Sequence, residues 1–240
     1  PGSGKTTLAL QFLLQGVKAG EPVLYVTLSE TSEELSVVAA SHGWNLDNVD
    51  LFELASADSV LGMGRDQSIL HSWEMELGGT IDLIRQEVER VNPRRIVFDS
   101  LSELRLLAQD PLRYRRQLLF LKQFFARLDT TVLLVDDLTG ATGVRDNHLH
   151  SLCHGVITLE RLTLDFGAAR RRMQIQKMRG VEFVAGYHDM IIRKGGIDIF
   201  PRLIAADHHA DFSGDPVPSK VPALDAILGG GPQRGTTTLI

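Results

Sequence analysis

The sequence predicts an α/β fold in which helices flank a mostly parallel central sheet, with antiparallel hairpins in the C-terminal part. Three observations predict it. Strand and helix patterns alternate along roughly the first 150 residues, as in parallel sheets whose strands are joined by helices. Beyond that point the pattern changes to paired strands with glycine-containing turns, which is typical of hairpins. The chain also opens with half of a phosphate-binding loop, a motif that joins a strand to a helix.

Local signals predict the elements of the first part. Runs of β-branched and aliphatic residues predict strands at 22–30, 49–54, 94–100 and 130–137. Helical spacing of apolar residues predicts a helix directly after the loop and further helices at 32–43, 79–93 and 110–128.

Capping and turn residues set the expected ends of these helices. Ser32 is the expected cap of the second helix, and Pro93 ends the third. Asp110 is the expected cap of the fourth helix, with Pro111 in its first turn. Residues 56–78 contain several glycines and no steady periodicity, which predicts a long loop or insertion.

Composition indicates a globular chain. Its 240 residues are 43% hydrophobic and 23% charged, enough for one α/β domain or for one domain plus a fragment. A single cysteine, Cys153, excludes an internal disulfide framework and fits a reducing cytoplasm. No apolar run approaches the ~20 residues of a membrane span, so we expect a cytoplasmic protein. The net charge of -5 gives no global attraction to nucleic acid, which is therefore not an expected partner.

The opening residues PGSGKTT are the second half of the phosphate-loop pattern G-x-x-x-x-G-K-[ST]. The pattern needs a glycine two residues before Pro1 and a strand before that glycine, so we expect the motif to start outside this sequence. Glycines let backbone N–H groups turn around phosphate oxygens, and the helix that follows directs its positive end at the anion. The expected phosphate-binding residues are Gly2, Ser3, Gly4, Lys5, Thr6 and Thr7, with the Thr6 hydroxyl on Mg²⁺. The alternative is a Gly/Ser turn that only happens to precede Lys-Thr.

Acids at the ends of strands are suited to phosphate chemistry. Asp99 ends the strand RIVFD, where it can hold Mg²⁺ through water opposite Thr6. Asp136 and Asp137 follow another apolar strand and are the alternative, although the order along the chain favours Asp99. Glu30 ends the strand VTLSE, where a carboxylate can orient or deprotonate the attacking water. The alternative for Glu30 is a helix-capping acid.

Five segments, in their order and spacing, resemble the ATPase domain of the KaiC family within the RecA superfamily. They are PGSGKTTLALQFLLQG, VLYVTLSET, RIVFDSLSEL, KMRG and GIDIFPRL. The resemblance covers nearly the whole chain and is more specific than a phosphate loop alone. It implies a RecA-like fold that binds ATP and Mg²⁺.

The resemblance also implies roles for single residues. In the family an acid pair after the second strand contains the catalytic base; here Ser29 takes the first position and only Glu30 remains. Lys177 and Arg179 match residues that reach the γ-phosphate bound by the next subunit of a hexameric ring, where they act as fingers in catalysis. The alternative for this pair is a solvated basic turn. The charge run at 169–173 is interpreted as a solvated face.

The same resemblance divides the chain. Residues 1–205 correspond to one RecA-like ATPase module without its first strand, 206–218 to a linker, and 219–240 to the opening helix and first strand of a second module. The chain is therefore expected to be a window from a tandem protein. We expect the segment TTTLI at 236–240 to fill the vacant first-strand position of the sheet.

The expected function is that of a Mg²⁺-dependent ATPase module with a signalling output in a homo-oligomeric ring. A Ser/Thr autokinase output is implied by the family as well. Two alternatives stay open: a RecA-type DNA repair or recombination ATPase, which single-stranded DNA would stimulate, and a non-hydrolysing scaffold that assembles on nucleotide. Ser29 at the catalytic pair is the observation that favours the scaffold.

Overall fold

The computed structural model describes residues 2–54, 72–108, 110–137, 147–204 and 213–237. The chain divides into two compact units, Pro1–Arg202 and Leu203–Ile240. Within the described residues, no helix is long and apolar enough to cross a membrane.

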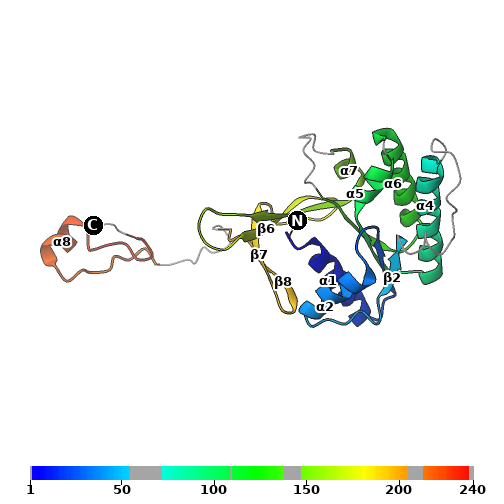
Figure 1. The fold of residues 1–240 in the computed structure, drawn as a ribbon. Coiled ribbons are helices and arrows are strands. Elements are labelled where there is room, and N and C mark those ends of the chain that lie inside the picture. Colours follow the sequence, from blue (N-terminus) through cyan, green and yellow to red (C-terminus); the bar gives the residue numbers. More distant parts are fainter. Residues whose placement is uncertain (1, 55–71, 109, 138–146, 205–212, 238–240) are drawn as a thin grey trace. The chain divides into compact units, whose positions relative to one another are not determined.

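A parallel four-stranded sheet forms the centre of the first unit (Figure 1). Its strands are β1 (Val23–Thr27), β2 (Asp50–Glu53), β3 (Arg95–Asp99) and β4 (Thr131–Val135), in the order β2-β1-β3-β4. All three pairings are parallel. All five residues of β1 are buried, as expected for a central strand covered on both faces. The predicted parallel sheet is confirmed.

One face of this sheet is covered by α1 (Lys5–Lys18) and α2 (Ser32–Ser41). Alternate residues of a strand point to opposite faces, so Val23 and Tyr25 of β1 pack on this side. The buried cluster consists of Ala9, Leu10, Leu13, Val23, Tyr25, Leu35, Ala39, Val49, Val97 and Val135. The cluster fixes α1, and with it the loop that precedes the helix, against the sheet.

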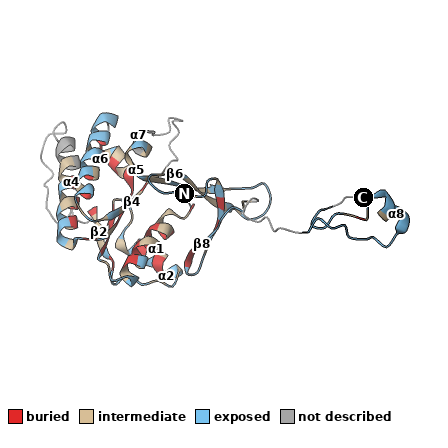
Figure 2. Cartoon of the chain, turned by 180° about the vertical axis from the view of Figure 1, so that it is seen from behind, coloured by how far each residue is buried: buried red, intermediate tan, exposed pale blue. Residues whose placement is uncertain are grey.

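The opposite face is covered by α4 (Ser72–Val91), α5 (Leu101–Ala108) and α6 (Pro111–Ala126). Leu24 and Val26 of β1 face these helices. Figure 2 shows the buried residues concentrated in the strands and on the helix faces that turn toward them. The first unit is therefore a three-layer α/β/α arrangement extended by a second sheet.

The second sheet is antiparallel, in the order β5-β6-β7-β8. Its strands are β5 (Gly155–Leu162), β6 (Arg170–Met178), β7 (Tyr187–Arg193) and β8 (Gly196–Phe200), preceded by the short helix α7 (Asn147–Leu152). Each neighbouring pair is antiparallel, which confirms the predicted C-terminal hairpins.

The β7–β8 hairpin contacts α1 and the end of α2, the two helices that cover one face of the parallel sheet. The Ile197 N–H donates to the Gln11 side-chain oxygen at 2.9 Å, and the Gly195 N–H donates to the His42 carbonyl at 3.0 Å. The His42 ring in turn lies 3.4 Å from the Thr7 hydroxyl, measured from Nε2 to Oγ1. The second sheet is thus attached close to the phosphate loop.

The second unit contains α8 (Pro222–Ile227), which has no buried residue, and an isolated bridge between Pro216 and Gln233. Among residues 236–240, positions 236 and 237 are described and lie in no strand, while 238–240 lie outside the described residues. The predicted strand at TTTLI and the predicted module boundaries therefore remain predictions.

Three expectations about the helices differ from the structure. The cap of α2 is Thr31, not Ser32. Helix α4 begins at Ser72, so part of the expected loop at 56–78 is helical, and residues 55–71 lie outside the described residues. Helix α5 between β3 and α6 was not predicted. The Asp110 cap and Pro111 in the first turn of α6 are confirmed.

Candidate functional site

The loop before α1 has the backbone of an anion-binding nest. Gly2 and Gly4 have φ of 72° and 102°, the left-handed region that glycine adopts without strain. Gly4 is the N-cap of α1, so the positive end of the helix dipole begins at the loop. Ser3 and Thr7 are both buried, with 7% of each exposed. The loop thus places two glycines in the left-handed region directly before the helix, while phosphate binding by residues 2–7 remains a prediction.

Lys5 of this loop forms an ion pair with Asp137, which lies two residues after the end of β4. Its Nζ lies 2.6 Å from Oδ1 of Asp137. Both side chains are partly exposed, so water screens the attraction and the pair is easily exchanged. Asp136 is turned elsewhere, because it accepts from the Ser102 hydroxyl at 2.9 Å and pairs with Arg105 at 2.7 Å. Of the two alternative acids, only Asp137 therefore contacts the loop.

Asp99 lies at the carboxyl end of β3, between Thr27 of β1 and Val135 of β4 in the sheet register. The carboxylate is buried and accepts a hydrogen bond from the Tyr25 hydroxyl at 2.7 Å. Burial raises the pKa of Asp99; the Tyr25 hydrogen bond and Lys5 lower it. Burial and the Asp99 charge in turn raise the pKa of Tyr25, which keeps the phenol a donor.

Glu30 lies beside the same group of side chains. Its pKa is raised, first by burial and then by the charges of Asp99 and Glu34, whereas a hydrogen bond from the Thr6 side chain and the charge of Lys5 lower it. One of its carboxylate oxygens, Oε2, is buried and has no hydrogen-bond partner within the described part of the chain. A buried acceptor of this kind is suited to a polar ligand.

Glu30 does not cap α2. Thr31 accepts a hydrogen bond from the Glu34 N–H at 3.2 Å, and the Thr31 N–H donates to the Glu34 carboxylate at 2.8 Å. This is a complete capping box, which satisfies the start of the helix without Glu30. The Glu30 backbone is held instead by Thr27, whose hydroxyl accepts from its N–H at 2.9 Å. The carboxylate remains available beside Asp99 and Thr6.

Lys177 and Arg179 contact the end of α7 in their own chain. Lys177 Nζ donates to the carbonyls of His150 at 2.6 Å and Cys153 at 2.8 Å, and the Arg179 guanidinium donates to the Ser151 carbonyl at 3.0 Å. Cations at the C-terminal end of a helix satisfy its free carbonyls. No hydrogen bond of the described residues joins either side chain to the phosphate loop. Their expected action on a neighbouring subunit remains a prediction.

The loop also contacts the second sheet, which sequence reasoning missed. A Cβ on Gly4 would lie 2.7 Å from Ile192 Cδ1, so the loop backbone packs directly on β7. At Gly2, the carbonyl accepts a hydrogen bond from Arg171 Nε at 3.0 Å, and a Cβ would lie 2.9 Å from the Arg161 guanidinium. The charge run at 169–173 is therefore not wholly a solvated face. Long-range packing of this kind has no local signal in the sequence.

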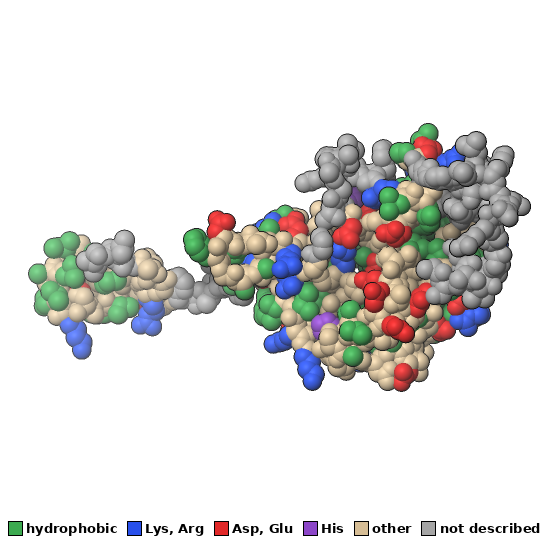
Figure 3. All heavy atoms as spheres, viewed as in Figure 1, with side chains coloured by type: hydrophobic (Ala, Val, Ile, Leu, Met, Phe, Trp, Pro, Cys, Tyr) green, Lys and Arg blue, Asp and Glu red, His purple; other side chains and the backbone are tan. Residues whose placement is uncertain are grey.

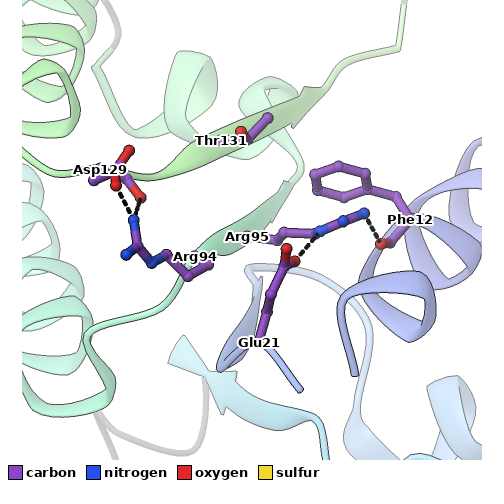
Figure 4. Close-up of a pocket in the computed structure, with 6 residues that line it drawn as sticks. All are labelled: Phe12, Glu21, Arg94, Arg95, Asp129 and Thr131. Carbon is purple, nitrogen blue, oxygen red and sulfur yellow. Dashed lines mark hydrogen bonds and ion pairs between the residues drawn. The ribbon is translucent and has the colours of Figure 1, made fainter. Parts of the chain in front are cut away.

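A hollow of about 560 Å³ lies away from this group of residues (Figure 4). Arg95, which lines it, begins β3, whereas Asp99 ends the strand, so the hollow lies toward the other edge of the sheet. The Arg95 guanidinium is bound by Glu21 at 2.5 Å and by the Phe12 carbonyl at 3.1 Å, and Arg94 pairs with Asp129. These charges are already satisfied within the chain, which argues against an anion site here.

The residues at the carboxyl ends of β1, β3 and β4 fit a nucleotide phosphate with a hard divalent cation. Backbone N–H groups and Lys5 suit phosphate oxygens, while the Thr6 hydroxyl and the Asp99 carboxylate supply oxygen ligands of the kind that Mg²⁺ prefers. Glu30 Oε2, which has no hydrogen-bond partner within the described residues, belongs to a carboxylate that interacts with Lys5, Thr6 and Asp99. Each of these residues was a candidate from the sequence. Tyr25, whose hydroxyl donates a hydrogen bond to Asp99, was not a candidate.

Comparison with known proteins agrees with this geometry. Residues 1–204 match the family model described as ATPase: KaiC. A UPF0273 protein of Pyrococcus horikoshii is 30% identical over 210 residues, which cover 84% of this chain and 83% of that protein. The circadian clock oscillator protein KaiC of Parathermosynechococcus lividus is 29% identical over 237 residues, 96% of this chain but 42% of that protein. The crystal structure of a KaiC-like protein from Pyrococcus horikoshii matches the fold with a TM-score of 0.66 at 24% identity, covering 84% of this chain and 86% of that one.

Proposed function

Because the chain belongs to the KaiC family of ATPase domains, we propose that it binds ATP with Mg²⁺ at residues 2–7 and hydrolyses it. The observation that carries the proposal is the meeting of Lys5, Glu30 and Asp99 at one edge of the parallel sheet, where the Asp99 charge raises the pKa of Glu30 and the Lys5 charge lowers the pKa of both carboxyl groups. Ligands of open α/β sheets bind at this carboxyl edge.

Each group has a role that follows from its surroundings. The N–H groups of the loop and Lys5 would hold the phosphates, with Lys5 exchanging Asp137 for phosphate oxygen. Thr6 and, through water, Asp99 would hold Mg²⁺, which neutralises charge on the transferring phosphoryl group. Glu30 would orient and deprotonate the attacking water; its raised pKa brings it nearer to the working pH of a general base.

The proposal extends to a ring-shaped homo-oligomer, hexameric as in the family resemblance, with a signalling output. Relatives named circadian clock oscillator proteins support a signalling role. In such a ring Lys177 and Arg179 would leave the α7 carbonyls and contact the nucleotide of the next subunit. A Ser or Thr hydroxyl in place of water at Glu30 would convert hydrolysis into autophosphorylation.

ATP turnover and assembly, measured together, test the proposal. We expect slow hydrolysis by the unmodified chain, and a loss of about 100-fold or more in Glu30→Gln while ATP-dependent assembly persists in light scattering. Lys5→Ala should lose both, because it removes the phosphate-binding cation. Glu33→Gln is the matched control, since Glu33 is an exposed acid in the first turn of α2.

The second candidate is a scaffold that binds nucleotide without hydrolysing it, which Ser29 favours because one of the family's two acids is absent. Assembly on ATP with no turnover in the unmodified chain would establish this scaffold and overturn the ATPase. Turnover that survives in Glu30→Gln would instead overturn the role of Glu30.

A further inference from the structure

Two arginines of the second sheet lie beside the phosphate loop of the same chain. Arg161 of β5 and Arg171 of β6 are directly opposite each other in the sheet register. Arg171 Nε donates to the Gly2 carbonyl at 3.0 Å, and a Cβ at Gly2 would lie 2.9 Å from Arg161 Nη1. In both Figures 1 and 2 the loop at the beginning of the chain lies beside β6. The two guanidinium groups therefore converge on one residue of the loop.

The neighbouring arginines of β6 have acidic partners. Arg170 pairs with Asp189 at 2.6 Å, and Arg172 pairs with Glu160 at 2.7 Å. Successive residues of a strand point to opposite faces, so these two share the face away from Arg171. That face of the charge run is an ordinary surface of cross-strand ion pairs.

Arg161 and Arg171 differ from these neighbours. No carboxylate in the described ranges lies within ion-pair distance of either guanidinium, and Arg161 is exposed. Like charges directly opposite each other on antiparallel strands destabilise a sheet. Such a departure from local pairing rules is expected at functional or strained sites.

We propose that Arg161 and Arg171 form a guanidinium pair that binds the terminal phosphate of a nucleoside triphosphate held by the loop of the same chain. The proposal rests on nucleotide binding at residues 2–7. Guanidinium groups bind phosphate oxygens through paired, charge-assisted hydrogen bonds. The pair would let a single subunit distinguish a triphosphate from a diphosphate.

The charges around the loop support a triphosphate rather than a smaller anion. Asp137 pairs with Lys5 and so offsets the charge of the loop's lysine, and both Lys177 and Arg179 are hydrogen-bonded to carbonyls at the end of α7. The two unpaired arginines are the cations left beside Gly2 among the described residues. An additional phosphate group gains more from them than a ligand that ends at the β-phosphate.

Calorimetric titration of the full chain with Mg²⁺ and either ADP or the non-hydrolysable triphosphate AMP-PNP tests the pair. We expect Arg161→Gln and Arg171→Gln each to weaken AMP-PNP binding about tenfold and to change ADP binding by less than about twofold. Arg161→Lys keeps the charge and should restore most of the preference for triphosphate. Arg170→Gln is the matched control, because that side chain belongs to the opposite face.

The ratio of the two affinities separates charge recognition from a structural role. If Arg171 only supports Gly2, both nucleotides lose affinity equally and the proposal is wrong. An unchanged ratio of AMP-PNP to ADP affinity in Arg161→Gln also overturns the proposed arginine pair. In that case, binding of ADP and AMP-PNP to the unmodified chain would still support the proposed nucleotide binding. If the unmodified chain binds neither nucleotide, the proposed function fails first and this inference with it.

Discussion

Asp99 illustrates how single residues prepare the site. The carboxylate is buried, which raises its pKa, yet its proposed role of holding a metal ion through water requires the ionised form. The Tyr25 hydroxyl, 2.7 Å from Asp99 Oδ2, opposes the effect of burial because it hydrogen-bonds to the ionised form. In the proposed site, Tyr25 would therefore be a positioning residue that acts through Asp99.

We expect Tyr25→Phe to shift the pH dependence of ATP turnover. Without the hydrogen bond the pKa of Asp99 rises further, so the protonated form persists to higher pH and the acid limb of the rate profile moves to higher pH. The apparent Mg²⁺ affinity should fall about three- to tenfold at neutral pH, as for loss of one hydrogen bond to a charged group. Steady-state rates against pH and Mg²⁺ concentration measure both effects.

Tyr114→Phe is the control for this prediction, since Tyr114 is another buried tyrosine of the first unit, on α6. A rate profile that stays in place in Tyr25→Phe, with unchanged Mg²⁺ dependence, would show that Asp99 does not depend on Tyr25.

Sequence signals predicted secondary-structure elements best where a local rule acts alone. Asp110 and Pro111 predicted the start of α6 correctly because both act through their own backbone. The cap of α2 was misplaced by one residue, although the capping-box pattern begins at Thr31 and ends at Glu34. Helix α4 was predicted to start too late because two adjacent glycines, Gly78 and Gly79, disfavour a helix. Packing of its later apolar residues against the sheet outweighs that cost.

The cap of α6 gives a prediction at the scale of an element. The Asp110 carboxylate accepts from the N–H groups of Leu112 at 3.3 Å and Arg113 at 3.2 Å. Asp110→Ala should lower the free energy of unfolding by about 1 kcal/mol, whereas Asp110→Asn keeps an acceptor and should cost less than about half of that. Urea denaturation of the three chains measures the difference. Equal losses in both variants would mean that the carboxylate charge, not the cap, stabilises the helix.

At the scale of the whole molecule, the sequence predicted which residues lie at the candidate site, but not the contacts with the second sheet that support the loop. Lys5, Asp99 and Glu30 follow from motifs, because a parallel sheet brings the carboxyl ends of its strands to one edge. The contacts of Gly2 and Gly4 with the second sheet join residues far apart in the sequence, so no local pattern predicts them. On the face shown in Figure 3, acidic side chains are scattered over the first unit, and no continuous basic surface is visible among its described atoms. That face does not favour the nucleic-acid alternative.

The division into two units leads to the last prediction. Every buried hydrophobic residue of the described chain lies between Ala9 and Ile197, and α8 buries none. A chain that ends at Arg202 should therefore keep its fold: we expect its unfolding midpoint to lie within about 2 °C of that of the full chain and its ATP affinity to change less than about twofold. Scanning calorimetry with and without ATP measures both quantities.

A core substitution calibrates the same experiment. Leu10 is fully buried in α1, so Leu10→Ala should lower the midpoint by about 10 °C in either chain. If ending the chain at Arg202 lowered the midpoint as much as Leu10→Ala does, residues 203–240 would have to contribute to the stability of the first unit. The burial pattern argues against this outcome, because a segment whose helix buries no side chain removes little apolar surface from water. If the midpoint and the ATP affinity stay unchanged in the shortened chain, residues 1–202 would be sufficient for nucleotide binding and would contain the proposed pair of Arg161 and Arg171.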